Sequence, residues 1–183
     1  QKGLDLIKSL GAKLLQLPIQ FVLLGTGDPA YERYFRSWHK RHRAIVHATI
    51  GFDNAWAHRI YAGADMFLMP SRFEPCGLGQ MISLRYGTIP IVRQTGGLAD
   101  SIAPYDAVRG AGNGFVFREY KPHALYDAVR HACEAFQDAD AWQALVSRVM
   151  QQDWSWSRSA GTYAALYAEA LESRAGRATA YSR

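Results

Sequence analysis

The chain has 183 residues, of which 49% are hydrophobic and 20% charged, so it fits one domain with a sizeable core and is not disordered. No apolar run approaches the ~20 residues that span a bilayer, and no secretory leader is visible, so we expect no membrane partner. The net charge of +5 suits a phosphorylated small molecule as well as nucleic acid. Two cysteines, Cys76 and Cys133, predict neither a disulfide framework nor a zinc site and favour a reducing, cytoplasmic setting.

Short apolar runs alternate with helical periods along the chain. A first helix is predicted where leucines recur at helical spacing from Leu4 to Leu15. The strands are expected to end near Leu24, Ala48, Met69, Val92 and Phe117. Further helices are expected over residues 29–42, 77–86, from 97, 122–136, 141–151 and about 155–172, and Asp53 is expected to cap a helix that reaches Ala62.

Short, wholly apolar strands separated by helices are typical of a parallel sheet covered on both faces. We therefore predict a doubly wound, Rossmann-like α/β domain over residues 1–173, followed by a flexible tail over 174–183. The basic run "HKRHR" is interpreted as a solvated helix end rather than a nucleic-acid site, and Trp154 and Trp156 are expected to pack at a helix junction.

Four polar or glycine-rich loops follow predicted strands: "GTGD", "GFDN", "SRFEPCGLG" and "RQTGG". Ligands of such folds bind beyond the carboxyl ends of the strands, so these loops are predicted to form one rim. Gly25 is either a simple turn residue or a point where a ligand approaches the backbone. Gly96 and Gly97 either form a tight turn or offer backbone N–H groups to phosphate or sugar hydroxyls.

Three further rim residues carry distinct chemistry. Glu74 either caps the next helix or accepts hydrogen bonds from a polyhydroxylated ligand. Phe52 is either a core residue or a ring that stacks on a base. Cys76 has no accompanying histidine and asparagine arrangement of a cysteine hydrolase, so a small residue whose backbone matters is favoured over a nucleophile. The six histidines show no metal-ligand spacing.

The segments "QKGLDL", "LLGTGD", "HRIYAGADMFLMPSRFEPCGLGQ", "RYGTIPIVRQTGGLADS" and "DWSWSRSAGTY" resemble, in this order, the carboxyl-terminal half of bacterial glycogen synthases and plant starch synthases. The resemblance runs over nearly all of residues 1–167. It implies the donor-binding domain of a retaining GT-B glycosyltransferase. Such enzymes transfer glucose from ADP-glucose to the non-reducing end of an α-1,4-glucan. The resemblance implies no cofactor, no metal, no nucleic-acid partner and a cytoplasmic location, or a plastid in a plant.

The resemblance also implies residue roles. Glu74 matches the carboxylate that binds the transferred glucose, and Lys2 the lysine that neutralises the donor's phosphates. Phe52 occupies the position of a tyrosine that stacks on adenine. The remaining implied donor contacts are Cys76 and Gly77 at the sugar and Leu78 and Gly79 at the ribose and phosphates. Gly96 and Gly97 are implied near the sugar and phosphates, and Gly25 in its glycine turn.

Two departures from the family pattern stand out. The chain reads "GLGQ" where the family often reads "GLTQ", so Gly79 removes a hydroxyl. Ile82 stands where many related glycosyltransferases place a second glutamate, which synthases of this family commonly lack as well.

The domain is expected to be incomplete at its amino terminus, and the first domain of the enzyme, with the acceptor groove, is absent. The isolated chain is therefore expected to be inactive. The alternatives are a non-catalytic nucleotide- or glucan-binding module and a related enzyme that uses UDP-glucose.

Overall fold

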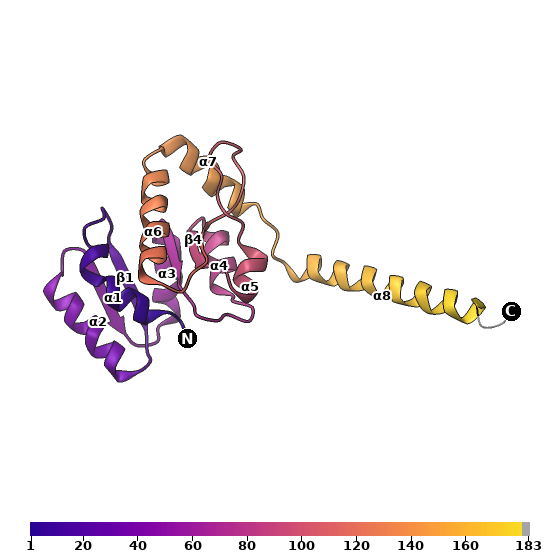
Figure 1. The fold of residues 1–183 in the computed structure, drawn as a ribbon, viewed down its shortest axis with the longest axis horizontal. Helices are drawn as coiled ribbons and strands as arrows, with labels where there is room; N and C mark the ends of the chain where they lie inside the picture. The colour runs from indigo at the N-terminus through magenta and orange to yellow at the C-terminus, as the bar shows by residue number, and fades with distance from the viewer. Residues whose placement is uncertain (181–183) are drawn as a thin grey trace. The chain divides into compact units, whose positions relative to one another are not determined.

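The computed structural model describes the backbone of residues 1–180 and the side chains of residues 1–173. The chain divides into two compact units, Gln1–Gln151 and a second that begins at Gln152. Helices and strands alternate through the first unit (Figure 1). They are α1 (Leu4–Leu14), β1 (Phe21–Gly25), α2 (Pro29–Arg41), β2 (Val46–Ile50), α3 (Asn54–Gly63), β3 (Met66–Met69), α4 (Gly79–Tyr86), β4 (Ile89–Arg93), α5 (Gly96–Ser101), β5 (Phe115–Phe117), α6 (Pro122–Phe136) and α7 (Ala139–Met150).

The described strands form two parallel groups. In one, β1 pairs with β2, with Phe21 opposite Val46. In the other, β4 lies between β3 and β5, with Met66 opposite Ile89 and Ile91 opposite Phe115. Every pairing between these strands is parallel, as the sequence predicted, and all five strands lie where they were expected. The expected single sheet is, however, divided between β1 and β3.

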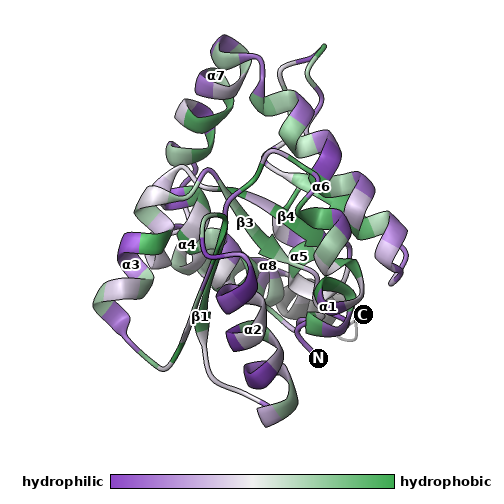
Figure 2. Cartoon of the chain, turned by 90° about the vertical axis from the view of Figure 1, so that its left-hand side faces the viewer, coloured by the Kyte–Doolittle hydropathy of each residue, from purple (hydrophilic) through white to green (hydrophobic). Residues whose placement is uncertain are grey.

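Helices cover both faces of the larger group. The first four residues of β4, Ile89 to Val92, are all buried, which requires apolar neighbours on both sides of the sheet. Helix α6 contacts β4 and β5, and α4 contacts β3 and β4. Figure 2 shows hydrophobic colour over much of β3 and β4. The core therefore follows the apolar runs that the sequence displays.

Capping side chains set the starts of α2 and α3. Asp28 accepts a hydrogen bond from the backbone N–H of Ala30, with Pro29 as the first residue of α2. Asp53 caps α3 by accepting from the N–H of Trp56, at the position predicted from the sequence. The first three residues of "HKRHR", His39 to Arg41, fall in the last turn of α2, where cations complement the helix dipole.

The second unit contains α8 (Trp156–Ala180). The helix runs past residue 173, where the domain was predicted to end, and the flexible tail over 174–183 stays a prediction; residues 181–183 lie outside the described residues. The predicted domain end at 173 also differs from the unit boundary after Gln151. Trp154 and Trp156, which were predicted to pack at a helix junction, are 39% and 87% exposed. Among the described residues, no helix combines the length and apolarity of a membrane span.

Leu125 of α6 has no exposed surface and provides a test of the core. We expect Leu125→Ala to lower the free energy of unfolding by about 2–5 kcal/mol, because it removes buried apolar contacts and leaves a cavity. Val108→Ala is the control, because Val108 is 97% exposed, and it should change stability by about 0.5 kcal/mol or less. Urea denaturation followed by circular dichroism measures both, and equal effects would contradict this description of the core.

Candidate functional site

Glu74 is a buried carboxylate at the carboxyl end of the larger strand group. Only 6% of the residue is exposed. Its Oε2 accepts a hydrogen bond from Lys2 Nζ at 2.5 Å and a second from Ser71 Oγ at 3.2 Å. Its Oε1 accepts none from the residues that the structure describes. The site therefore holds the oriented carboxylate of Glu74, whose Oε1 is available to accept a hydrogen bond. Beside it lies the ammonium group of Lys2, whose side chain is 62% exposed.

Arg93, the last residue of β4, holds the segment that leads to Glu74. Its guanidinium donates to the backbone carbonyl of Ser71 at 2.8 Å and also to the carbonyl of Arg72. The guanidinium groups of Arg72 and Arg93 lie 4.6 and 5.5 Å from the centre of the Tyr120 ring, within range of a cation–π interaction. Burial raises the pKa of the Tyr120 hydroxyl, and its hydrogen bond to Asp5 raises it further.

Gly96 and Gly97 bring the start of α5 against the loop that carries Glu74. The N–H of Gly97 donates to the carbonyls of Glu74 and Pro75, at 3.1 and 3.2 Å. A Cβ at Gly96 would lie 2.1 Å from the Glu74 carbonyl oxygen, and one at Gly97 would lie 2.1 Å from that of Cys76. The tight-turn reading is thus the one that the structure displays, and the Gly97 N–H is already used.

Gln80, which is buried, holds the segment between Cys76 and α4 through hydrogen bonds of its side-chain amide. Gln80 Nε2 donates to the carbonyls of Cys76 and Gly77 at 3.1 and 2.8 Å. Gly77 has a φ of +76°, a left-handed conformation that favours glycine. A Cβ at Gly79 would lie 2.9 Å from the Phe67 ring, which gives a packing reason for glycine there. Leu78 precedes α4 without a side-chain cap and is 66% exposed.

Gly25 and Phe52 lie at the carboxyl ends of the smaller strand group. The carbonyl of Gly25 accepts from the N–H of Gly51 at 3.2 Å, so the two loops start side by side. A Cβ at Gly25 would meet nothing within 4 Å, so packing does not require glycine there. Phe52 is 92% exposed, which rules out the core reading. Its ring is free to contact a ligand.

Half of the predicted site residues share one cavity of about 990 Å³. Those that line it are Lys2, Glu74, Gly77, Leu78 and Gly79. The other five, which do not line it, are Gly25, Phe52, Cys76, Gly96 and Gly97. Gly96 and Gly97 do not line the cavity but pack against the backbone carbonyls of Glu74 and Cys76.

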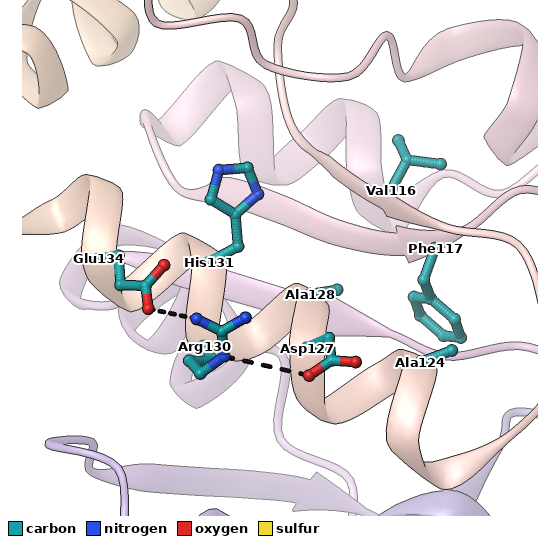
Figure 3. Close-up of a pocket in the computed structure, with 8 residues that line it drawn as sticks. All are labelled: Val116, Phe117, Ala124, Asp127, Ala128, Arg130, His131 and Glu134. Atoms are coloured by element: carbon teal, nitrogen blue, oxygen red, sulfur yellow. Dashed lines mark hydrogen bonds and ion pairs between the residues drawn. The ribbon is translucent and has the colours of Figure 1, made fainter.

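A second hollow of about 360 Å³ runs along α6 and β5 (Figure 3). Its charged side chains are engaged with one another, since Arg130 pairs with Asp127 at 4.0 Å and also with Glu134. None of the predicted site residues lies there. Within the described part of the chain, no three His, Cys, Asp or Glu residues are grouped so that they could hold a metal ion.

Sequence reasoning missed three residues that shape the site: Ser71, Gln80 and Arg93. All three stand inside quoted motifs. Gln80 and Arg93 act through backbone carbonyls, and Ser71 acts through the carboxylate of Glu74 three residues later, contacts that no spacing rule reveals. The pairing of Lys2 with Glu74, 72 positions apart, was likewise not predicted.

Parallel strands, covering helices and a polar rim with an oriented carboxylate define a doubly wound type of α/β domain. The profile of the family "Glycosyl transferases group 1" matches residues 1–144, and the chain belongs to this family. It is 56% identical over 173 residues to a glycogen synthase of Desulforudis audaxviator. The aligned residues make up 94% of this chain and 35% of that protein. A glycogen synthase of Moorella thermoacetica is 51% identical over 175 residues, 95% of this chain and 36% of that protein.

Among solved structures, the catalytic domain of starch synthase IV from Arabidopsis thaliana, bound to ADP and acarbose, superposes with a TM-score of 0.83. It is 38% identical and covers 94% of this chain and 36% of that chain. The resemblance inferred from the sequence and the predicted fold class are therefore confirmed. The chain spans about a third of the length of these relatives, 35% in the first case.

The contact of Gly97 with Cys76 provides a test of the site's architecture. We expect Gly97→Ala to lower the free energy of unfolding by about 1–3 kcal/mol, because the new methyl group must displace a backbone carbonyl. Gly63→Ala is the matched control: nothing lies within 4 Å of its Cβ position, and alanine in a helix stabilises by up to about 1 kcal/mol relative to glycine. Chemical denaturation compares the two, and a neutral Gly97→Ala would contradict the close approach.

Proposed function

We propose that this chain is the donor-binding half of a glucosyltransferase of the glycogen and starch synthase type. The whole enzyme transfers glucose from ADP-glucose to the non-reducing end of an α-1,4-glucan, with retention of the anomeric configuration. The names of its glycogen synthase relatives and the ADP and acarbose bound to the similar starch synthase support this proposal. The observation in the molecule itself that carries it is the carboxylate of Glu74.

Glu74 is arranged to recognise hydroxyl groups. Its Oε2 is held by Lys2 and Ser71, and its Oε1 is left to accept from a ligand. A hydrogen bond to a charged group contributes about 1.5–3 kcal/mol, and one that strengthens as the glycosidic bond breaks contributes to the rate. We assign Glu74 to the transferred glucose as the catalytic carboxylate.

Lys2 and the start of α4 are assigned to the diphosphate. Lys2 lines the cavity with a side chain that is 62% exposed, and Leu78 and Gly79 bring the uncapped N-terminus of α4 to the same cavity. A cation and free helix N–H groups stabilise the negative charge that grows on a departing diphosphate. Gly77 and Cys76 complete the sugar side, with Gly96 and Gly97 holding their backbone in place.

Phe52 is assigned to the nucleobase, next to Gly25 on the neighbouring rim. Its exposed ring offers a face for stacking without loss of core packing. The α-1,4-glucan acceptor and the other domain of the enzyme complete the site in this proposal. We propose that no metal takes part and that the enzyme works in the cytoplasm, or in the plastid of a plant.

Titration of the chain with ADP-glucose tests this assignment through Phe52. We expect Phe52→Ala to weaken binding about 5- to 150-fold, because stacking of a base on an aromatic ring contributes about 1–3 kcal/mol. Phe52→Tyr should bind nearly as tightly as the wild type. Since Phe52 is 92% exposed, neither change should alter stability.

Titration with UDP-glucose is the matched comparison for the base. Tighter binding of UDP-glucose than of ADP-glucose would contradict the proposed donor. Binding of ADP-glucose that is indifferent to Phe52→Ala would contradict the stacking role.

Glu74→Gln, made in the protein at the full length of its relatives, tests the catalytic assignment. The isolated chain is not suitable for this assay, because we expect it to transfer no glucose without the rest of the cleft. We expect turnover to fall at least about 100-fold, in the range seen when one preorganised electrostatic contact is removed. The affinity for ADP should change less than about 5-fold, within the modest net value of one hydrogen bond.

Incorporation of labelled glucose into glycogen measures turnover, and calorimetry measures ADP binding. Equal losses of turnover and of ADP affinity would show that Glu74 has a structural role only. Ser71→Ala is the control, because it removes one hydrogen bond from a neutral donor to Oε2 and leaves the charge of the carboxylate in place.

A further inference from the structure

The side-chain amide of Gln80 packs against the loop that leads into α4. Only 1% of the residue is exposed. Its Nε2 donates to the backbone carbonyls of Cys76 and Gly77 at 3.1 and 2.8 Å, and to Ser101 Oγ at 3.1 Å. Because a carbonyl oxygen can only accept, the two carbonyls fix which end of the amide faces the loop. The buried nitrogen of Gln80 thus sets the direction of two consecutive peptide groups.

The oxygen of the same amide has a different environment. Gln80 Oε1 is buried and accepts no hydrogen bond from the residues that the structure describes. A Cβ at Gly77 would lie 2.5 Å from it, so the amide directly contacts the backbone of the loop. An unpaired buried acceptor lowers stability. The contribution of the amide at this position therefore comes from its nitrogen, which holds the loop.

The two peptide groups that Gln80 holds present their N–H groups on the opposite side. In a trans peptide the N–H points away from the carbonyl, and the described chain has no cis peptide bond. The carbonyls of Cys76 and Gly77 face Gln80. The N–H groups of Gly77 and Leu78 therefore face away from it. Gly77 and Leu78 line the cavity of about 990 Å³ together with Glu74, and Gln80 lies outside that lining, so both N–H groups are turned towards the cavity.

The N–H groups of Gly77 and Leu78 are available to a ligand. Neither donates a hydrogen bond within the part of the chain that the structure describes. Gly77 has a φ of +76°, and Leu78 has a φ of −103° and a ψ of −29°, so a left-handed residue is followed by a right-handed one. Successive N–H groups in such an alternation form a concave site for an anion. The loop therefore offers two adjacent donors to the oxygen atoms of a ligand.

Ser101 of α5 connects this arrangement to the loop of Glu74. Its Oγ accepts from Gln80 Nε2 and donates to the carbonyl of Gly97 at 2.6 Å. The N–H of Gly97 in turn donates to the carbonyl of Glu74 at 3.1 Å. Consecutive hydrogen bonds therefore join the amide of Gln80, through α5, to the backbone that carries the Glu74 carboxylate.

We propose that Gln80 is a positioning residue for the diphosphate of the donor, an inference that rests on the proposed function. Its amide holds two carbonyls away from the cavity, so that the N–H groups of Gly77 and Leu78 meet the phosphate oxygens. These donors stabilise the charge of the bound diphosphate and, more strongly, the charge that grows as it departs. Gln80 itself touches no part of the donor and acts only through the direction of the two peptide groups.

Gln80→Met tests this role in the protein at the full length of its relatives. Methionine keeps the length of the side chain and removes the donor, so the two peptide groups are released. We expect the Kd of ADP to rise about 10- to 100-fold, the range that the loss of one hydrogen bond to a charged group produces. The Kd of adenosine, which has no phosphate, should stay nearly unchanged. Calorimetry measures both constants.

Asn113→Leu is the matched control for loss of a buried amide. Asn113 is also buried, and its side-chain amide donates to the backbone carbonyl of Ser101 at 3.0 Å. The substitution should lower the melting temperature, as Gln80→Met does, and leave the Kd of ADP unchanged. Ser101→Ala keeps Gln80 but removes its link to α5, so we expect a smaller rise in the Kd of ADP, about 2- to 10-fold.

Gln80→Glu gives a readout that a purely structural role would not move. A buried carboxyl group has a raised pKa, and only its protonated form can donate to a carbonyl. The loss of ADP affinity relative to the wild type at the same pH should therefore shrink as the pH falls from about 8 to about 6. The loss caused by Gln80→Met should not depend on pH, because methionine does not titrate.

The outcomes distinguish this inference from the proposed function. ADP binding that Phe52→Ala weakens and Gln80→Met leaves intact would overturn the role of Gln80 and support the proposed donor site. Equal losses for ADP and adenosine would show that Gln80 only maintains the fold. Binding of pyrophosphate that Gln80→Met weakens, in a protein that prefers UDP-glucose, would support the role of Gln80 and contradict the proposed donor. If Gln80→Met does not fold, Ser101→Ala decides, and an unchanged Kd of ADP in that variant would overturn the proposal.

Discussion

The site depends on one backbone contact, that between the start of α5 and the loop of Glu74. The N–H of Gly97 bonds to the carbonyls of Glu74 and Pro75, and the two glycines leave no room for a Cβ. This contact fixes the loop at its carboxyl side, while Arg93 fixes it at Ser71 and Arg72. A carboxylate that must be both buried and oriented needs its main chain held at both ends, since its own side chain has three rotatable bonds.

Burial of Glu74 also determines the electrostatics of the cavity. A carboxylate that is 6% exposed requires compensation, and Lys2 supplies it from the chain's first residues. Because the ammonium group stays largely in solvent, the pair adds little stability by itself. Its value lies in placing a positive charge next to an acceptor oxygen, an arrangement suited to a ligand with both phosphate and hydroxyl groups.

The rim of the candidate site is divided between the two strand groups. The carboxyl ends of β1 and β2 carry Gly25 and Phe52, and those of β3 and β4 carry Glu74 and the glycine pair. The cavity between β1 and β3 separates these two halves of the rim.

Much of the fold was predictable from local patterns. The strands ending near Leu24 and Met69 and the Asp53 cap follow from periodicity and capping chemistry, which act over a few residues. The sequence by itself determined the parallel class, the order of the elements, the family and the loops that gather at the rim. Only the tertiary structure decided that Phe52 is exposed, that Lys2 meets Glu74, that Gln80 and Arg93 support the loop and that β1 stands apart from β3. The physical reason is range: pattern and propensity are properties of neighbouring residues, whereas burial, ion pairing and strand adjacency arise between residues that only the folded chain brings together.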